Sequence, residues 1–155
     1  KKQQAELRDA YNSDDSKFVA LYGRRRVGKT YLVKQTFKDQ FTFSHSGLAN
    51  GSLQEQLYGW RSSLEDAGLQ VPSSPKHWLE AFDMLKELVR LSSAKKKVIF
   101  IDEMPWMDTP RSKFVSSSGM GGLRCGMMCC LSFVVRQHPG LSTRYSVIMA
   151  VCTIV

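Results

Sequence analysis

One glycine-rich, cationic string constrains the fold of this chain more than any other feature. The string is Gly23-Arg24-Arg25-Arg26-Val27-Gly28-Lys29-Thr30, which has the pattern G-x-x-x-x-G-K-[ST]. It follows an alternating run, residues 17–22, that predicts a short strand. Residues 29–37 contain no helix breaker and predict a helix directly after it. A strand, a tight glycine loop and a helix in this order predict a phosphate-binding loop.

The chemistry of such a loop assigns a role to each fixed position. The two glycines let the backbone curl closely around a polyphosphate, so that successive N–H groups point inward. Lys29 is predicted to bridge the β- and γ-phosphates as a catalytic cation, and the Thr30 hydroxyl to ligate Mg²⁺. The predicted nucleotide-binding residues are Gly23, Arg24, Arg25, Arg26, Val27, Gly28, Lys29, Thr30 and Tyr31. We interpret the three arginines, which occupy variable positions, as solvated side chains.

A pair of acids follows a second apolar run. Residues 98–101 are continuously apolar, as a parallel strand buried on both faces requires, and Asp102 and Glu103 come next. Ligands of open α/β sheets collect at the carboxyl ends of the strands. Asp102 is therefore predicted to hold magnesium through its water shell, and Glu103 to act as a general base on the attacking water. In isolation the pair could equally be a solvated turn or a helix cap, but the upstream loop favours the functional interpretation.

The remaining pattern predicts an α/β fold. Residues 41–43 indicate a further strand, and residues 54–67 and 76–91 indicate two amphipathic helices. Strands and helices alternate along the chain, which is typical of the α/β class.

Composition bounds the class of protein. At 155 residues, with 43% hydrophobic and 23% charged residues, the chain fits one soluble globular domain. No apolar run is long enough to span a bilayer, and no signal-peptide core is visible at the start, so we expect a cytoplasmic protein without a membrane partner.

The formal net charge of +8 raises the question of a nucleic-acid partner. All 14 acids lie before residue 116, whereas three arginines and no lysine follow it. The earlier part is thus only mildly basic, and Arg24–Arg26 and Lys95–Lys97 supply much of its positive charge. Nucleic-acid binding is supported by charge alone.

Two strings together resemble the archaeal-type ATPases of the AAA superclass, a prokaryotic family. They are Y-G-R-R-R-V-G-K-T-Y-L-V at residues 22–33 and I-D-E-M-P-W-M at residues 101–107. The likeness runs from about Glu6 to Val115. It implies a three-layer P-loop NTPase with a mostly parallel sheet, in which a sensor strand lies between the strand that bears the acids and the strand before the loop. A helical lid and a further domain commonly follow in that family.

The sequence departs from this pattern after Val115. Residues 1–115 are interpreted as a partial ATPase core, and residues 116–155 as an atypical tail, so the central sensor strand and the lid are expected to be missing. A frame slip accounts for the departure. If each shifted codon takes the last base of one residue and the first two of the next, residues 133–140 can encode C-G-S-A-T-S-W, which matches the sensor strand of the family. The same phase lets residues 118–122 encode W-N-G-W and residues 149–154 encode G-G-L-Y-N. Apolar segments of the tail, such as residues 146–155, could still form strands and occupy the gap.

The expected function is binding of ATP with Mg²⁺, which intact relatives hydrolyse to drive a conformational switch. Turnover by this chain is an open question, because an arginine finger and a sensor residue are not identifiable in it. The alternative is a non-catalytic, nucleotide-gated interaction module, associated with nucleic acid through its basic groups. The resemblance also allows a homo-oligomer.

Overall fold

The computed structural model describes residues 2–14, 17–22, 28–108, 112, 114 and 145–153. Helices and strands alternate along them except at the consecutive helices α3 and α4, and two short 3₁₀ helices are also present. In chain order the elements are α1 (Lys2–Asn12), β1 (Lys17–Tyr22), α2 (Lys29–Phe37), η1 (Lys38–Gln40), β2 (Phe41–Ser46), α3 (Leu53–Asp66), α4 (Trp78–Leu91), β3 (Lys96–Asp102), η2 (Met104–Trp106) and β4 (Tyr145–Thr153). The α/β class predicted from the sequence is confirmed.

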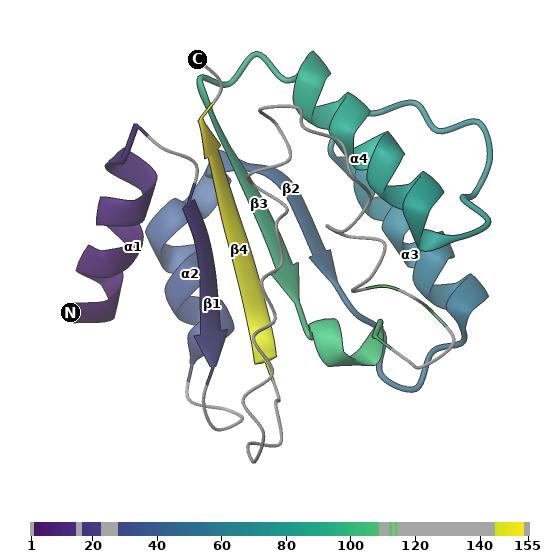
Figure 1. The fold of residues 1–155 in the computed structure, drawn as a ribbon, viewed down its shortest axis with the longest axis horizontal. Coiled ribbons are helices and arrows are strands. Elements are labelled where there is room, and N and C mark those ends of the chain that lie inside the picture. Colours follow the sequence, from purple (N-terminus) through teal and green to yellow (C-terminus); the bar gives the residue numbers. More distant parts are fainter. Residues whose placement is uncertain are drawn as a thin grey trace.

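The four strands form a single sheet in the order β1-β4-β3-β2. β2 runs parallel to β3, whereas β4 runs antiparallel to both of its neighbours. β1, β2 and β3 therefore share one direction. Figure 1 shows α1 and α2 on one side of this sheet and α3 and α4 on the other. The result is a three-layer α/β arrangement consistent with a truncated P-loop NTPase, in which β2 and β3 form the parallel pair and β4 pairs antiparallel with β1 and β3.

β3 is buried on both faces and separates two apolar cores. Because successive side chains of a strand point to opposite faces, Val98 and Phe100 pack in the core with α1 and α2. Ile99 and Ile101 pack in the other core, beneath α3 and α4. The continuous apolar run at residues 98–101 thus has the two-sided burial that the sequence predicted.

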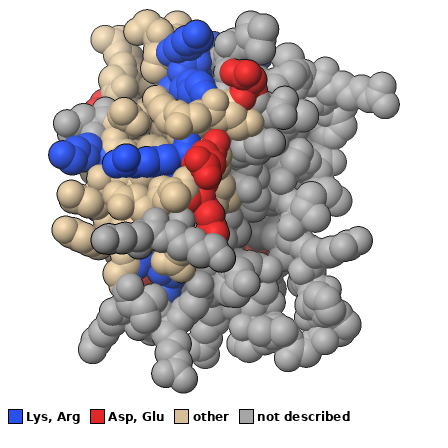
Figure 2. Space-filling view, turned by 90° about the vertical axis from the view of Figure 1, so that its left-hand side faces the viewer, with Lys and Arg blue, Asp and Glu red and all other residues tan. Residues whose placement is uncertain are grey.

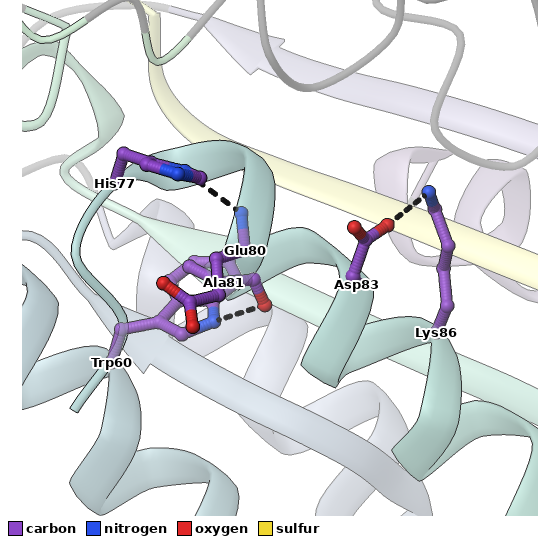
Figure 3. A network of polar contacts seen from close by, with 6 residues as sticks. All are labelled: Trp60, His77, Glu80, Ala81, Asp83 and Lys86. Carbon is purple, nitrogen blue, oxygen red and sulfur yellow. Dashed lines mark hydrogen bonds and ion pairs between the residues drawn. The ribbon is translucent and has the colours of Figure 1, made fainter. Parts of the chain in front are cut away.

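α3 and α4 begin at well-defined caps. Ser52 and Glu55 form a capping box, in which the Ser52 N–H donates to Glu55 Oε2 at 2.7 Å and the Glu55 N–H donates to Ser52 Oγ at 3.3 Å. The Ser52 N–H and the Ser52 hydroxyl both donate to the Glu55 carboxylate, and these two bonds lower the pKa of Glu55. At the start of α4, the His77 side chain accepts from the Glu80 N–H at 3.2 Å (Figure 3).

One tryptophan ties α3 to α4. The side chain of Trp60 is fully buried, and its indole N–H donates to the Ala81 carbonyl at 3.1 Å (Figure 3). Its ring lies 5.3 Å from those of Trp78 and Phe82, measured between centroids. Each of these two helices is 14 residues long, and among the described residues no helix combines the length and apolar character that a bilayer span requires.

α1 was not predicted from the sequence. It presents only Leu7 as a fully buried apolar side chain, so it lacks a clear apolar stripe. Lys96 ties its end to β3, because the Lys96 ammonium donates to the carbonyls of Tyr11 and Ser13 at 2.6 and 3.1 Å. The Lys97 ammonium similarly donates to the Ala94 carbonyl at 2.7 Å. Two of the three lysines at residues 95–97 therefore have a structural role within the chain.

The face that carries α1 has mixed charge. Figure 2 shows blue and red side chains next to one another over the described part of this face, without a continuous basic surface. Lysines engaged by backbone carbonyls and interspersed with acids provide a weaker electrostatic footprint for a nucleic acid than their number suggests.

β2 is longer than the strand that the sequence predicted at residues 41–43. β2 continues through Ser44, His45 and Ser46, because pairing with residues 100–102 of β3 overrides the modest strand preference of serine.

β4 comes from the tail and lies between β1 and β3, the position that the family resemblance assigns to the sensor strand. It runs antiparallel there, whereas the three other strands share one direction. It supplies hydrogen-bonding partners to both strands.

Trp60→Ala is expected to destabilise the fold by about 3–5 kcal/mol, because it removes a large buried ring and leaves a cavity between α3 and α4. Urea denaturation followed by circular dichroism measures the change. Leu79→Ala, at a side chain that is 52% exposed on α4, serves as the control and should change stability by less than about 0.5 kcal/mol. Equal effects of the two substitutions would contradict the packing described here.

Candidate functional site

Thr30 and Asp102 meet at the carboxyl end of the sheet, although 72 positions separate them in the chain. Asp102 ends β3 and, by strand alternation, lies on the same face as Val98 and Phe100, which α2 covers. Thr30 lies in the first turn of α2 and donates its hydroxyl proton to Asp102 Oδ2 at 2.7 Å. Asp102 is only 7% exposed. The fold thus brings together the two residues predicted to hold magnesium.

The described part of the predicted phosphate loop begins at Gly28. Gly28 adopts a left-handed φ of 80° and precedes α2 as its N-cap residue. A side chain is disfavoured in this conformation, which explains the glycine. Lys29 is half-buried at the first position of α2, and Tyr31 is 70% exposed. Gly23, Arg24, Arg25, Arg26 and Val27 lie outside the described residues.

The N-terminus of α2 therefore faces the same corner as the acids. The first N–H groups and the helix dipole give this end a partial positive charge, which favours a bound anion. The helix end, a lysine and a hydroxyl at successive positions form an arrangement suited to polyphosphate.

Glu103 follows Asp102 in an unusual backbone conformation. Its φ is 50° and its ψ 37°, which is left-handed and uncommon for a residue other than glycine. Its N–H donates to Asp102 Oδ1 at 2.9 Å, so both carboxylate oxygens of Asp102 have hydrogen-bond donors. The Glu103 side chain makes no capping hydrogen bond to the η2 helix that it precedes and is partly exposed. The helix-cap alternative therefore does not explain Glu103.

The donor set fits a magnesium ion. Mg²⁺ prefers hard oxygen ligands and keeps several of its own waters. The Thr30 hydroxyl and the Asp102 carboxylate supply such oxygens at hydrogen-bonding distance from each other. A cavity of about 1010 Å³ adjoins Asp102, and Lys34, Ser44, His45 and Ser46 also line it. Space for a ligand therefore lies next to Asp102, although Lys29, Thr30 and Glu103 do not line this cavity.

His45 is held as a neutral imidazole. Ser63 Oγ donates to the Gly59 carbonyl at 3.1 Å, so it accepts from His45 Nδ1–H at 2.9 Å. Nε2 is then a bare acceptor, and it is buried without a hydrogen-bond partner among the described residues. Burial lowers the pKa of His45 to about 4. These contacts make His45 a local hydrogen-bonding residue between β2 and α3.

One residue near the acids was missed by the sequence analysis. Gln56 is buried in α3, and its side chain contacts both the segment after β2 and the segment after Glu103. A signal was present, because Gln56 falls on the apolar stripe formed by Leu53, Leu57, Trp60 and Leu64. A polar side chain on such a stripe indicates a specific buried partner.

Comparison with known proteins gives one match. The sequence profile described as "AAA domain" matches residues 15–108, which is more than half of the chain. No significant match was found among curated proteins or solved structures. The matched range contains the whole loop motif, Asp102 and Glu103.

The lowered pKa of His45 predicts a pH-dependent stability. The imidazole of His45 binds a proton with an ordinary pKa near 6.5 in the unfolded chain, but with a pKa of only about 4 in the folded chain. The buried neutral imidazole of His45 therefore contributes fully to the free energy of unfolding above pH 6.5, and this contribution declines as the pH falls towards 4. It amounts to about 3 kcal/mol at most. Urea denaturation between pH 7 and 4 should show a shallower decline in His45→Gln than in the wild type.

Ser63→Ala is the matched control for this measurement. It removes the hydrogen bond to Nδ1 but keeps the titrating imidazole, so the steeper decline should persist. Identical pH profiles for the wild type and His45→Gln would contradict the assignment of a buried neutral imidazole.

Proposed function

The chain belongs to the AAA domain family, a family of nucleotide-binding ATPase domains, and we propose that it binds ATP together with Mg²⁺ at the corner between α2 and β3. The contact of 2.7 Å between the Thr30 hydroxyl and Asp102 Oδ2 carries this proposal, because it joins the two predicted metal-binding residues. Lys29 neutralises the β- and γ-phosphates, as the G-x-x-x-x-G-K-[ST] motif implies. The bound magnesium ion would supply charge neutralisation between the phosphates.

Glu103 is the proposed general base. It directly follows the metal-binding acid, and its partly exposed carboxylate can accept a proton from a water molecule near the terminal phosphate. Lys29 contributes to catalysis by stabilising charge on the transferred phosphoryl group. Hydrolysis in intact relatives would drive a conformational switch. Because an arginine finger and a sensor residue are not identifiable in this sequence, binding is the primary activity proposed for it.

On the basis of the sequence, we further propose that the chain is of the archaeal type within the AAA domain family and comes from a prokaryote. We also propose a cytoplasmic location and a homo-oligomer. An alternative function, a nucleotide-gated module that contacts nucleic acid, rests on the net charge of +8. The carbonyl contacts of Lys96 and Lys97 weaken that alternative. A steep fall of DNA affinity with added salt would support it.

We also propose that the ATPase core ends near residue 115 and that residues 116–155 are an out-of-frame translation of the sensor region. Support comes from the three family strings that the shifted phase can encode. The antiparallel direction of β4 is consistent with this origin, because the resemblance implies a parallel strand at that position. Sequencing the encoding DNA tests the proposal, which fails if the shifted phase does not contain those strings.

Calorimetric titration with Mg-ATP should show saturable binding to the wild type, and Lys29→Ala should weaken that binding at least about tenfold, because the cation that contacts the phosphates is lost. Glu103→Gln should bind Mg-ATP with nearly wild-type affinity, since a general base acts only in the chemical step. Any phosphate release by the wild type should be abolished in Glu103→Gln.

Circular dichroism on the same samples separates loss of binding from loss of folding. A folded wild-type protein that does not bind Mg-ATP would overturn the proposed function. Equal affinity of the wild type and Lys29→Ala would overturn the assignment of the phosphate loop.

A further inference from the structure

The segment after β2 lies directly against the backbone of Glu103. The Gly47 N–H donates to the Asp102 carbonyl at 2.9 Å, which extends the pairing of β2 with β3 by one residue. A Cβ atom at Gly47 would lie 2.5 Å from the Glu103 carbonyl oxygen, closer than real Cβ contacts allow. Only glycine permits this approach, so residues 47–51 and the Glu103 turn form one tightly packed unit.

Gln56 joins the two halves of this unit from α3. Its Oε1 accepts from the Leu48 N–H at 2.9 Å, and its Nε2 donates to the Leu48 carbonyl at 2.6 Å. The same Nε2 also donates to the Trp106 carbonyl in η2 at 3.2 Å. The side chain is only 3% exposed. One buried amide therefore fixes both the segment after β2 and the helical turn after Glu103.

The turn at Glu103 needs such support because its backbone is strained. A left-handed conformation is unfavourable for a residue other than glycine, and surrounding contacts must offset its cost. The Trp106 N–H donates to the Glu103 carbonyl at 3.1 Å, and the carbonyl of Trp106 is held by Gln56. Gln56 thus acts on Glu103 through Trp106, which lies at the other end of the same turn.

We propose that Gln56 is a positioning residue that fixes the Glu103 carboxylate for its role as general base. The inference rests on the proposed function of Glu103. It also makes α3 a mechanical link to the site, because the helix that carries Gln56 holds the turn next to Asp102. A shift of the reacting groups by about 1 Å can lower a catalysed rate about a hundredfold, so the cost of losing this link falls on the chemical step.

The test compares Gln56→Leu with Gln54→Leu. Leucine at position 56 continues the apolar stripe of α3 and keeps the approximate volume, but it removes all three hydrogen bonds. Gln54 is exposed on the same helix, so Gln54→Leu controls for the added apolar surface. In single-turnover ATP hydrolysis, Gln56→Leu should lower the rate about tenfold or more, with the Kd for Mg-ATP unchanged within about twofold. Gln54→Leu should match the wild type in both.

Amide exchange in the Mg-ATP-bound protein gives a second readout that does not depend on turnover. The N–H groups of Gly47, Glu103 and Trp106 should exchange at least about tenfold faster in Gln56→Leu, while those of α4 are unchanged. If the wild type binds Mg-ATP but does not hydrolyse it, the proposed hydrolysis fails by itself, and the exchange at Glu103 still decides the role of Gln56.

Two results would overturn the positioning role. One is that Gln56→Leu leaves the exchange rate at Glu103 unchanged and, if the wild type hydrolyses ATP, leaves the hydrolysis rate unchanged as well. The other is a parallel loss of affinity and of thermal stability in Gln56→Leu, which would assign Gln56 to folding alone.

Discussion

The two-sided burial of β3 is the constraint on which the other features depend. A strand covered on both faces must present apolar side chains in both directions, and Val98 to Ile101 do so. The alternation that assigns Val98 and Phe100 to the α2 side also assigns Asp102 to that side, at the point where the apolar run ends. The position of the acid is therefore a consequence of the packing of the strand, and the hydrogen bond to Thr30 follows from the position of α2 over the same face.

The candidate site is assembled from both sides of the sheet. α2 contributes the helix N-terminus with Lys29 and Thr30, and β3 contributes Asp102. The Glu103 turn is held from the opposite layer, where Gln56 of α3 contacts the segments on either side of it. A glycine at position 47 permits these segments to pack closely. The geometry of the acids thus depends on a polar contact within the α3 and α4 layer as well as on the phosphate loop.

Much of this arrangement could be predicted from the sequence, and the parts that could not share a physical reason. The strand and helix that flank the loop motif, the apolar run before Asp102 and the stripe of α4 are local patterns, and each was identified with its correct element. α1 and the extension of β2 to Ser46 depend on tertiary contacts, namely the Lys96 contact with the end of α1 and the pairing of β2 with β3. The position and direction of β4 also depend on pairing between distant segments, which no local pattern contains. The contacts of Gln56 link α3 to residues 48 and 106, and only its place on an apolar stripe indicated them.

The central claim is that Thr30 and Asp102 hold the metal ion of a bound nucleotide. Electron paramagnetic resonance of Mn²⁺, used in place of Mg²⁺ with ATP, tests it most directly. Thr30→Val should weaken binding of Mn²⁺-ATP about tenfold or more, because it removes an oxygen ligand of the metal cation. Thr36→Val alters a threonine of the same helix whose hydroxyl donates to the Leu32 carbonyl, and it should leave the affinity unchanged. Equal affinities of the wild type, Thr30→Val and Thr36→Val would contradict the account.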